Sequence, residues 1–186
     1  MQSLFKRLVP FVAALVTTLG LLSTPAAALD PENALVIELK NGRVVIEMLP
    51  DLAPNHVARI KELAREGFYD GIVFHRVIDG FMAQTGDPTG TGRGGSGKNL
   101  AAEFSREPFA RGIVGMARSQ NPNSGDSQFF IMFDRAASLD GQYTVWGRVV
   151  EGMDKVDTIK RGSRAQNGAV SDPDRMLSVR VLADIQ

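Results

Sequence analysis

The stretch FHRVIDGFMAQTGD, residues 74–87, decides how the rest of this chain is interpreted. Two short runs of apolar and β-branched residues flank an Asp-Gly pair, which is typical of a tight turn between antiparallel strands. Because alternate side chains of a strand share a face, we expect Phe74, Arg76 and Ile78 on one face of the first strand. A charged Arg76 among apolar neighbours has two explanations. Its aliphatic part packs while its guanidinium reaches water or a carboxylate, or the residue belongs to a functional site.

Outward from this hairpin, similar short runs recur along the chain and two amphipathic segments interrupt them. We expect strands over 34–40, 43–49, 72–78, 81–86, 112–117, 128–133, 144–150 and 177–183, and helices over 54–66 and 152–161. The Asn41-Gly42 pair predicts a type I′ turn. About eight short strands with only two helices do not fit the regular alternation of a doubly wound sheet. We therefore predict a mainly β fold, a closed eight-stranded antiparallel β-barrel capped by two α-helices, with a sandwich as the alternative.

Residues 1–28 have the pattern of a secretory signal peptide: two basic residues without an acid, an apolar run over 8–22, and a small-residue site ending at Ala28. The run is interrupted and shorter than the ~20 residues of a membrane-spanning helix. We expect cleavage after Ala28, which leaves one domain over 29–186 with no stable membrane association. The alternative is an uncleaved N-terminal anchor. The leader alone does not separate a periplasm from secretion or an organelle lumen, and we expect the periplasm.

The 186 residues contain 21 basic and 21 acidic side chains, two histidines and no cysteine. Loss of the leader removes two of the cations and leaves 19 against 21, a net charge of −2. Such a surface gives no reason to expect nucleic acid or an anionic membrane as a partner. Without cysteine the chain has no disulfide, thiolate metal site or cysteine nucleophile. We expect no metal and no cofactor.

The glycine-rich segment 90–98 matches G-x-G-x-x-G and the first seven places of a phosphate-binding loop. Asn99 stands where that loop needs a Ser or Thr to hold Mg²⁺, and Pro108 limits a following helix to about two turns. We therefore do not expect a nucleotide-binding site here, because the loop lacks the Mg²⁺ ligand and the following helix that such a site needs. We interpret 90–98 as a mobile surface loop.

Three segments of the chain are rich in polar and aromatic residues. They are FYDGIVFHRVIDGFMAQTGDPTGTGRGGSG at 68–97, GMARSQNPNSGDSQFFIMF at 115–133 and LDGQYTVWGRVVEGMDKVD at 139–157. In this order, these segments resemble the cyclophilin family of peptidyl-prolyl cis–trans isomerases. The resemblance runs from about Ala34 to Ile185. It implies an eight-stranded barrel with two capping helices, an active site on its outer face, and proline-containing polypeptides as partners.

Carried over by position, the resemblance implies that Arg76 is the catalytic residue. It implies a proline pocket lined by Phe81, Met82, Phe130 and Leu139, and a peptide held by Gln84 and the backbone around Arg118. It also implies a site completed by His75, Ala117, Gln128 and Tyr143, with Gly92 and Ser119 bordering the adjoining pocket for the residue before proline.

The chain departs from the family pattern at several positions. Ser138 stands where many members carry a tryptophan that helps to bind cyclosporin, so we expect cyclosporin to bind weakly. Tyr143 replaces a common histidine and Arg118 a common asparagine, and we expect both to be tolerated. The loop over 118–128 is one residue longer than in the best-known members.

The function that we predict is an isomerase, a monomer, that accelerates X-Pro isomerisation while exported proteins fold. The alternative is a non-catalytic chaperone that binds Pro-containing segments. Arg76 together with Gln84 favours the enzyme, because a pure binder needs no donor aimed at the prolyl nitrogen.

Overall fold

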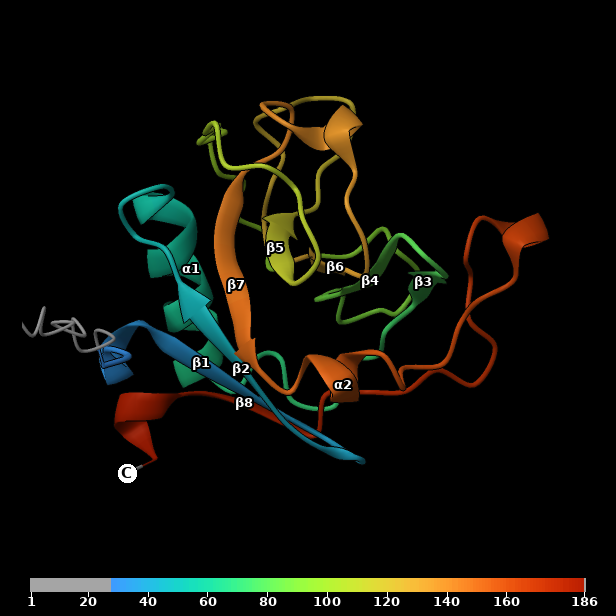
Figure 1. Ribbon diagram of the computed structural model, residues 1–186, viewed down its shortest axis with the longest axis horizontal. Coiled ribbons are helices and arrows are strands. Elements are labelled where there is room, and N and C mark those ends of the chain that lie inside the picture. Colours follow the sequence, from blue (N-terminus) through green and yellow to red (C-terminus); the bar gives the residue numbers. More distant parts are fainter. Residues whose placement is uncertain (1–27, 186) are drawn as a thin grey trace, which may run out of the picture.

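The computed structural model describes residues 28–185 and contains one curled antiparallel sheet of eight strands (Figure 1). The strands are β1 (Ala34–Leu39), β2 (Gly42–Met48), β3 (Arg76–Ile78), β4 (Met82–Thr85), β5 (Ile113–Met116), β6 (Phe129–Met132), β7 (Val145–Glu151) and β8 (Ser178–Val181). Their order in the sheet is β3-β4-β6-β5-β7-β2-β1-β8. Helix α1 (Pro54–Arg65) packs against β8, and α2 (Met153–Val156) packs against β2. The mainly β prediction is confirmed, and the single continuous sheet replaces the sandwich alternative.

The predicted leader lies outside the described residues, apart from Ala28. Across residues 28–185, no helix has both the length and the apolar character needed to cross a membrane.

The prediction of a closed barrel is wrong, because β3 and β8 remain the two edges of the sheet and no described ladder joins them. The gap between these two edges, the seam, is bridged by irregular backbone of the C-terminal segment, which contacts β3 and the residues before it. One such contact is the Phe74 amide, which donates to the Asp174 carbonyl at 2.8 Å. Strand geometry ends here for a physical reason. Asp172 adopts a φ of 50°, and Pro173 has no amide hydrogen to give to a ladder.

The hairpin of β1 and β2 forms as predicted, but its turn is not type I′. Leu39 pairs with Gly42, so the two loop residues are Lys40 and Asn41. Among these residues only Gly42, at 126°, has a positive φ, whereas a type I′ turn needs two such residues in succession.

The stretch 74–87 forms the predicted hairpin of β3 and β4, with Gly80 at a φ of 68° in the connecting turn. The strand begins only at Arg76, however, and the expected shared face is wrong for Phe74. Phe74 lies in the main core while Arg76 and Ile78 lie on the outer face. The alternation fails because residues 72–75 are irregular backbone that bonds to the C-terminal segment rather than to β4.

The two faces of the β4–β6–β5 half of the sheet carry separate hydrophobic clusters. On β6, Phe129 and Ile131 enter the main core, while Phe130 and Met132 enter a smaller outer cluster. The period-2 geometry of a strand explains why four consecutive buried residues serve two cores. The outer cluster is the foundation of the candidate site.

Helix α1 occupies the predicted range and packs Val57, Ile60 and Leu63 into the main core. Its first turn is capped from a distance by Glu103, which accepts from the amides of residues 55 and 56 at 3.0 Å each. Helix α2 is shorter than the predicted 152–161, because the Thr158 hydroxyl bonds the Lys155 carbonyl and the chain continues in turns.

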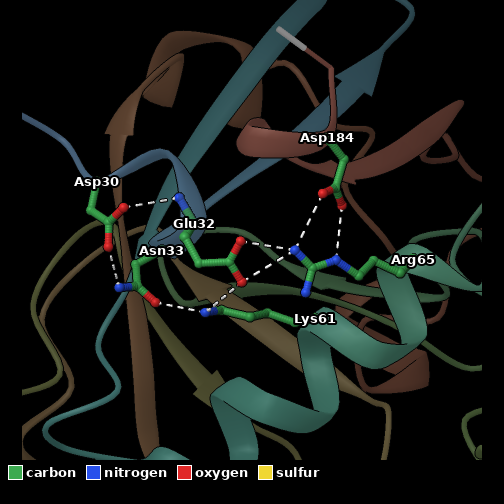
Figure 2. Close-up of polar contacts among 6 residues, drawn as sticks. All are labelled: Asp30, Glu32, Asn33, Lys61, Arg65 and Asp184. Carbon is green, nitrogen blue, oxygen red and sulfur yellow. Dashed lines mark hydrogen bonds and ion pairs between the residues drawn. The ribbon is translucent and has the colours of Figure 1, made fainter.

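The two ends of the described chain are held on α1 by exposed polar contacts (Figure 2). Asp30 accepts from the amide of Glu32, and Glu32 and Asp184 both accept from the Arg65 guanidinium at 2.9 Å. Exposed ion pairs contribute little stability individually. Their effect is to fix both chain ends at the side of the molecule away from β3 (Figure 1).

Candidate active site

The strand register places four residues from distant parts of the chain in one row on the outer face. Arg76 of β3 lies opposite Gln84 of β4, Gln84 lies opposite Phe130 of β6, and Phe130 lies opposite Gly115 of β5. Directly opposite residues on neighbouring strands project to the same face. The row therefore joins a cation, an amide and an aromatic ring.

An apolar cavity of about 180 Å³ opens beside this row. Its lining consists of Phe81, Met82, Ala117, Phe130 and Leu139, with Arg76, Gln84, Arg118 and Tyr143 as the polar members. Apolar walls with a few polar groups are typical of small-molecule sites. The cavity suits a compact apolar ring whose polar attachments face the rim.

The depth of this cavity depends on Gly115. A Cβ atom there would lie 2.5 Å from the ring of Phe130 and 2.6 Å from the ring of Phe109. These two rings stack with centroids 5.8 Å apart, and Tyr143 packs edge-on against both. A side chain at position 115 would displace Phe130 toward the cavity.

Arg76 is half-buried at the rim and is held at three points. Its Nη1 donates to Gln84 Oε1 at 3.1 Å, its Nε donates to the Asn167 carbonyl at 3.0 Å, and its Nη2 donates to Asn167 Oδ1 at 3.1 Å. Burial lowers the pKa of Arg76, with a smaller opposing contribution from Tyr143. An arginine begins so far above neutrality that the guanidinium stays charged. Of its five N–H groups, one on each terminal nitrogen remains for a ligand.

A chain of amides extends from Arg76 across the site. Because arginine is only a donor, Gln84 must present its oxygen to Arg76, which turns Gln84 Nε2 toward Gln128 Oε1 at 2.9 Å. Gln128 Nε2 in turn donates to the Gly94 carbonyl at 2.8 Å. The orientation of each amide therefore follows from the charge at one end.

A larger cavity of about 560 Å³, lined mostly by glycines and polar side chains, adjoins the first and is walled by the glycine-rich loop. Asp87 anchors this loop by accepting from the Thr89 and Gly92 amides at 2.8 and 2.5 Å. Burial opposes ionisation of Asp87, but the hydrogen bonds from Thr89 and from the amides of residues 94 and 92 lower its pKa to about 2. The segment interpreted as a mobile surface loop is thus one wall of the site.

Arg118 lines both cavities and is held over Tyr143. Its guanidinium carbon lies 4.4 Å from the Tyr143 ring centroid, and its Nη2 donates to the Gln142 carbonyl at 2.9 Å. The two departures from the family pattern therefore contact one another. Ser138 is exposed and lines neither cavity.

Comparison with known proteins agrees with this geometry. Residues 34–181 match the family described as cyclophilin type peptidyl-prolyl cis-trans isomerase/CLD. The chain belongs to the cyclophilin family. A "probable peptidyl-prolyl cis-trans isomerase" of Brucella suis is 57% identical over 179 residues, which cover 90% of this chain and 91% of that protein. A peptidyl-prolyl cis-trans isomerase of Synechococcus elongatus is 38% identical over 149 residues, covering 80% and 96%.

Solved cyclophilin structures share the fold. A cyclophilin from Hirschia baltica is 32% identical with a TM-score of 0.76, covering 85% of this chain and 77% of that one. A cyclophilin from Cryptosporidium parvum, crystallised in the presence of the dipeptide Ala-Pro, is 27% identical with a TM-score of 0.72, covering 80% and 98%. This cyclophilin is therefore an isomerase, as predicted, rather than the non-catalytic alternative.

The structure brings nearly all of the predicted site residues to the two adjoining cavities. Gly92, Ser119 and Gln128 line the larger one. His75 is the exception, because it lines neither cavity and lies beneath the loop, where a Cβ on Gly92 would be 3.5 Å from its ring. Burial lowers the pKa of His75 and keeps it neutral near pH 7. Its role as a substrate contact stays a prediction.

Sequence reasoning missed several residues on which the site depends. Asn167 holds Arg76, Asp87 anchors the loop, and Phe109 supports the floor of the apolar cavity. The Asn-Gly pair at 167–168 was a readable turn signal. Nothing in its spacing indicates that the turn lies against Arg76, which is 91 residues away.

Proposed function

We propose that this cyclophilin isomerises X-Pro bonds with Arg76 as the catalytic residue. The proposal is carried by one observation: a charged guanidinium with free N–H groups stands at the rim of an apolar cavity. The cavity would receive the proline ring, and the guanidinium would face the nitrogen of the same residue.

The chemistry needs no more than this arrangement. Amide resonance opposes rotation about the X-Pro bond with a barrier of about 20 kcal/mol. At the twisted geometry the prolyl nitrogen regains its lone pair and becomes a hydrogen-bond acceptor. A fixed N–H donor stabilises that state more than the planar one, which lowers the barrier. No covalent bond is made or broken.

Peptide binding would use both cavities. The proline ring would occupy the apolar cavity. The crystallisation of the Cryptosporidium parvum relative in the presence of the dipeptide Ala-Pro supports a proline-containing ligand. Gln84 keeps one N–H beyond its bond to Gln128 and can donate it to the peptide backbone. The polar cavity beside Gly92 and Ser119 would take the side chain before the proline.

We further propose that the enzyme works as a monomer in the periplasm, on exported proteins whose folding waits for proline isomerisation. The leader pattern of residues 1–28 supports this location. Ala28 is exposed, and the N-terminal end of the described chain lies away from β3 (Figure 1), so cleavage after Ala28 would leave the cavities unchanged. N-terminal sequencing of the periplasmic protein should begin at Leu29, and a chain that begins at Met1 would contradict the assignment.

The catalytic assignment is tested by exchange NMR on an Ala-Pro peptide, comparing the parent with Arg76→Ala and Arg76→Lys. Loss of one preorganised donor should lower the catalysed rate by tens-fold or more, on the order of 2–3 kcal/mol. Lysine keeps the charge without the planar fork and should recover little activity. Arg148→Ala removes an exposed arginine of β7 that pairs with Glu47, and serves as the matched control. A folded Arg76→Ala variant with the parent rate would refute the role of Arg76.

Cyclosporin binding is expected to be weak because Ser138 is small and its side chain adds no wall to either cavity. Ser138→Trp should tighten inhibition in the same peptide assay. Equal inhibition of parent and variant would contradict this reasoning.

A further inference from the structure

The segment that follows α2 runs along the edge of β3 that faces away from β4 (orange in Figure 1). The Gly162 amide donates to the Val77 carbonyl at 2.9 Å, and the Val77 amide donates to the Gly168 carbonyl at 2.8 Å. Strand β3 has only three residues. These backbone bonds therefore determine where the turn 163–169 lies relative to Arg76.

Asn167 occupies an unusual backbone position in this turn. Its φ is 52°, in the left-handed region that few residues other than glycine adopt. Gly168 follows at a φ of 82° and is buried so closely that a Cβ there would lie 2.5 Å from the Ile78 side chain. The tight contact of Gly168 with β3 holds Asn167 in place beside Arg76.

Asn167 binds the Arg76 guanidinium at two points on one edge. Its carbonyl accepts from Nε at 3.0 Å and its Oδ1 accepts from Nη2 at 3.1 Å. Two acceptors from one residue restrict both the position and the plane of a guanidinium. Gln84 accepts from Nη1, so the three contacts leave one N–H on each terminal nitrogen.

We propose that Asn167 is a positioning residue that sets the plane of the Arg76 guanidinium for the prolyl nitrogen. This inference rests on the proposed role of Arg76. Asn167 lines neither cavity, so it contributes to the reaction through Arg76 rather than through peptide binding. Without its amide oxygen, Nη2 would sample more orientations and point at the nitrogen in a smaller fraction of complexes.

Asn167→Gly is the informative substitution. Glycine adopts a positive φ readily and keeps the main-chain acceptor, so the variant removes only the Oδ1 contact. We expect kcat for the Ala-Pro peptide to fall about threefold to tenfold with KM unchanged. This is less than the full value of a charge-assisted hydrogen bond, because Asn167 is exposed and water recovers part of the contact. Asp172→Gly is the matched control, because Asp172 is an exposed residue of the same segment with a φ of 50°. It should retain the parent kcat.

A double-mutant cycle separates positioning from a structural effect. In the Arg76→Ala background, Asn167→Gly should change kcat by less than about 1.5-fold, because the group that it positions is absent. A parent-like kcat in Asn167→Gly, an equal loss in Asp172→Gly, or an undiminished loss in the Arg76→Ala background would each overturn the inference. If Arg76→Ala itself has the parent rate, the proposed function fails and the inference fails with it.

Discussion

Replacing Gln84 with leucine tests whether the amide chain across the site contributes to catalysis. The change preserves most of the side-chain volume but removes the acceptor of Arg76 Nη1, the donor to Gln128 and the N–H proposed for the peptide backbone. A hydrogen bond to a charged group contributes about 1.5–3 kcal/mol. Gln84 is only half-buried, so water recovers part of this value. We expect a loss of about 1.5 kcal/mol in transition-state stabilisation, or roughly tenfold in kcat/KM.

The assay is exchange NMR of an Ala-Pro peptide with parent, Gln84→Leu and Gln128→Leu proteins, each checked by urea unfolding. Gln128 reaches Arg76 only through Gln84, so its substitution should cost about threefold, the value of a neutral hydrogen bond. Gln120→Leu, in an exposed residue that lines neither cavity, is the control for an exposed Gln→Leu change. A folded Gln84→Leu protein within twofold of the parent, or a larger loss in Gln128→Leu, would refute the reasoning.

Two further predictions concern charge. Burial lowers the pKa of His75 below its ordinary 6.5, with Asp87 opposing and Arg76 adding to the shift, so unfolding takes up a proton as the pH falls below that value. Urea unfolding should show a loss of stability from pH 7.5 to 5.5 that is smaller in His75→Gln, and equal losses would contradict this assignment. Arg93 and Arg118 line the polar cavity together with one carboxylate, Asp126, which already accepts from the Ser96 hydroxyl and the Gly97 amide. The cations remain in excess, so peptides with Glu rather than Lys before proline should have a kcat/KM about threefold higher. The preference should shrink in Arg118→Asn and at high salt, and a charge-independent rate would exclude it.

The local elements of this fold were readable from short-range signals. The Asp-Gly turn correctly predicts that the strands carrying Arg76 and Gln84 pair. Pro54 and Gly67 correctly bracket α1. These signals act over a few residues, where backbone torsions and side-chain spacing are set by the residues themselves.

The errors lie where distant segments decide the backbone. Phe74 was assigned to the wrong face because residues 72–75 bond to the C-terminal segment, which no pattern within 72–78 reveals. The open seam beside Pro173 has the same origin, because contacts between distant segments replace a regular ladder there. The early end of α2 is a local exception, where the Thr158 hydroxyl bonds the Lys155 carbonyl three residues before it.

The sequence by itself determined the antiparallel β class, the family and the identity of Arg76 and Gln84 as neighbours, because these follow from local pairing and from motifs. Only the tertiary structure decided how Arg76 is held. The register of β4 and β6 places Phe130 beside Gln84, and a turn 91 residues further along the chain brings Asn167 to the guanidinium. Residues so far apart meet only when the sheet curls and the C-terminal segment closes on β3, because orientation at the site is a property of packing rather than of spacing.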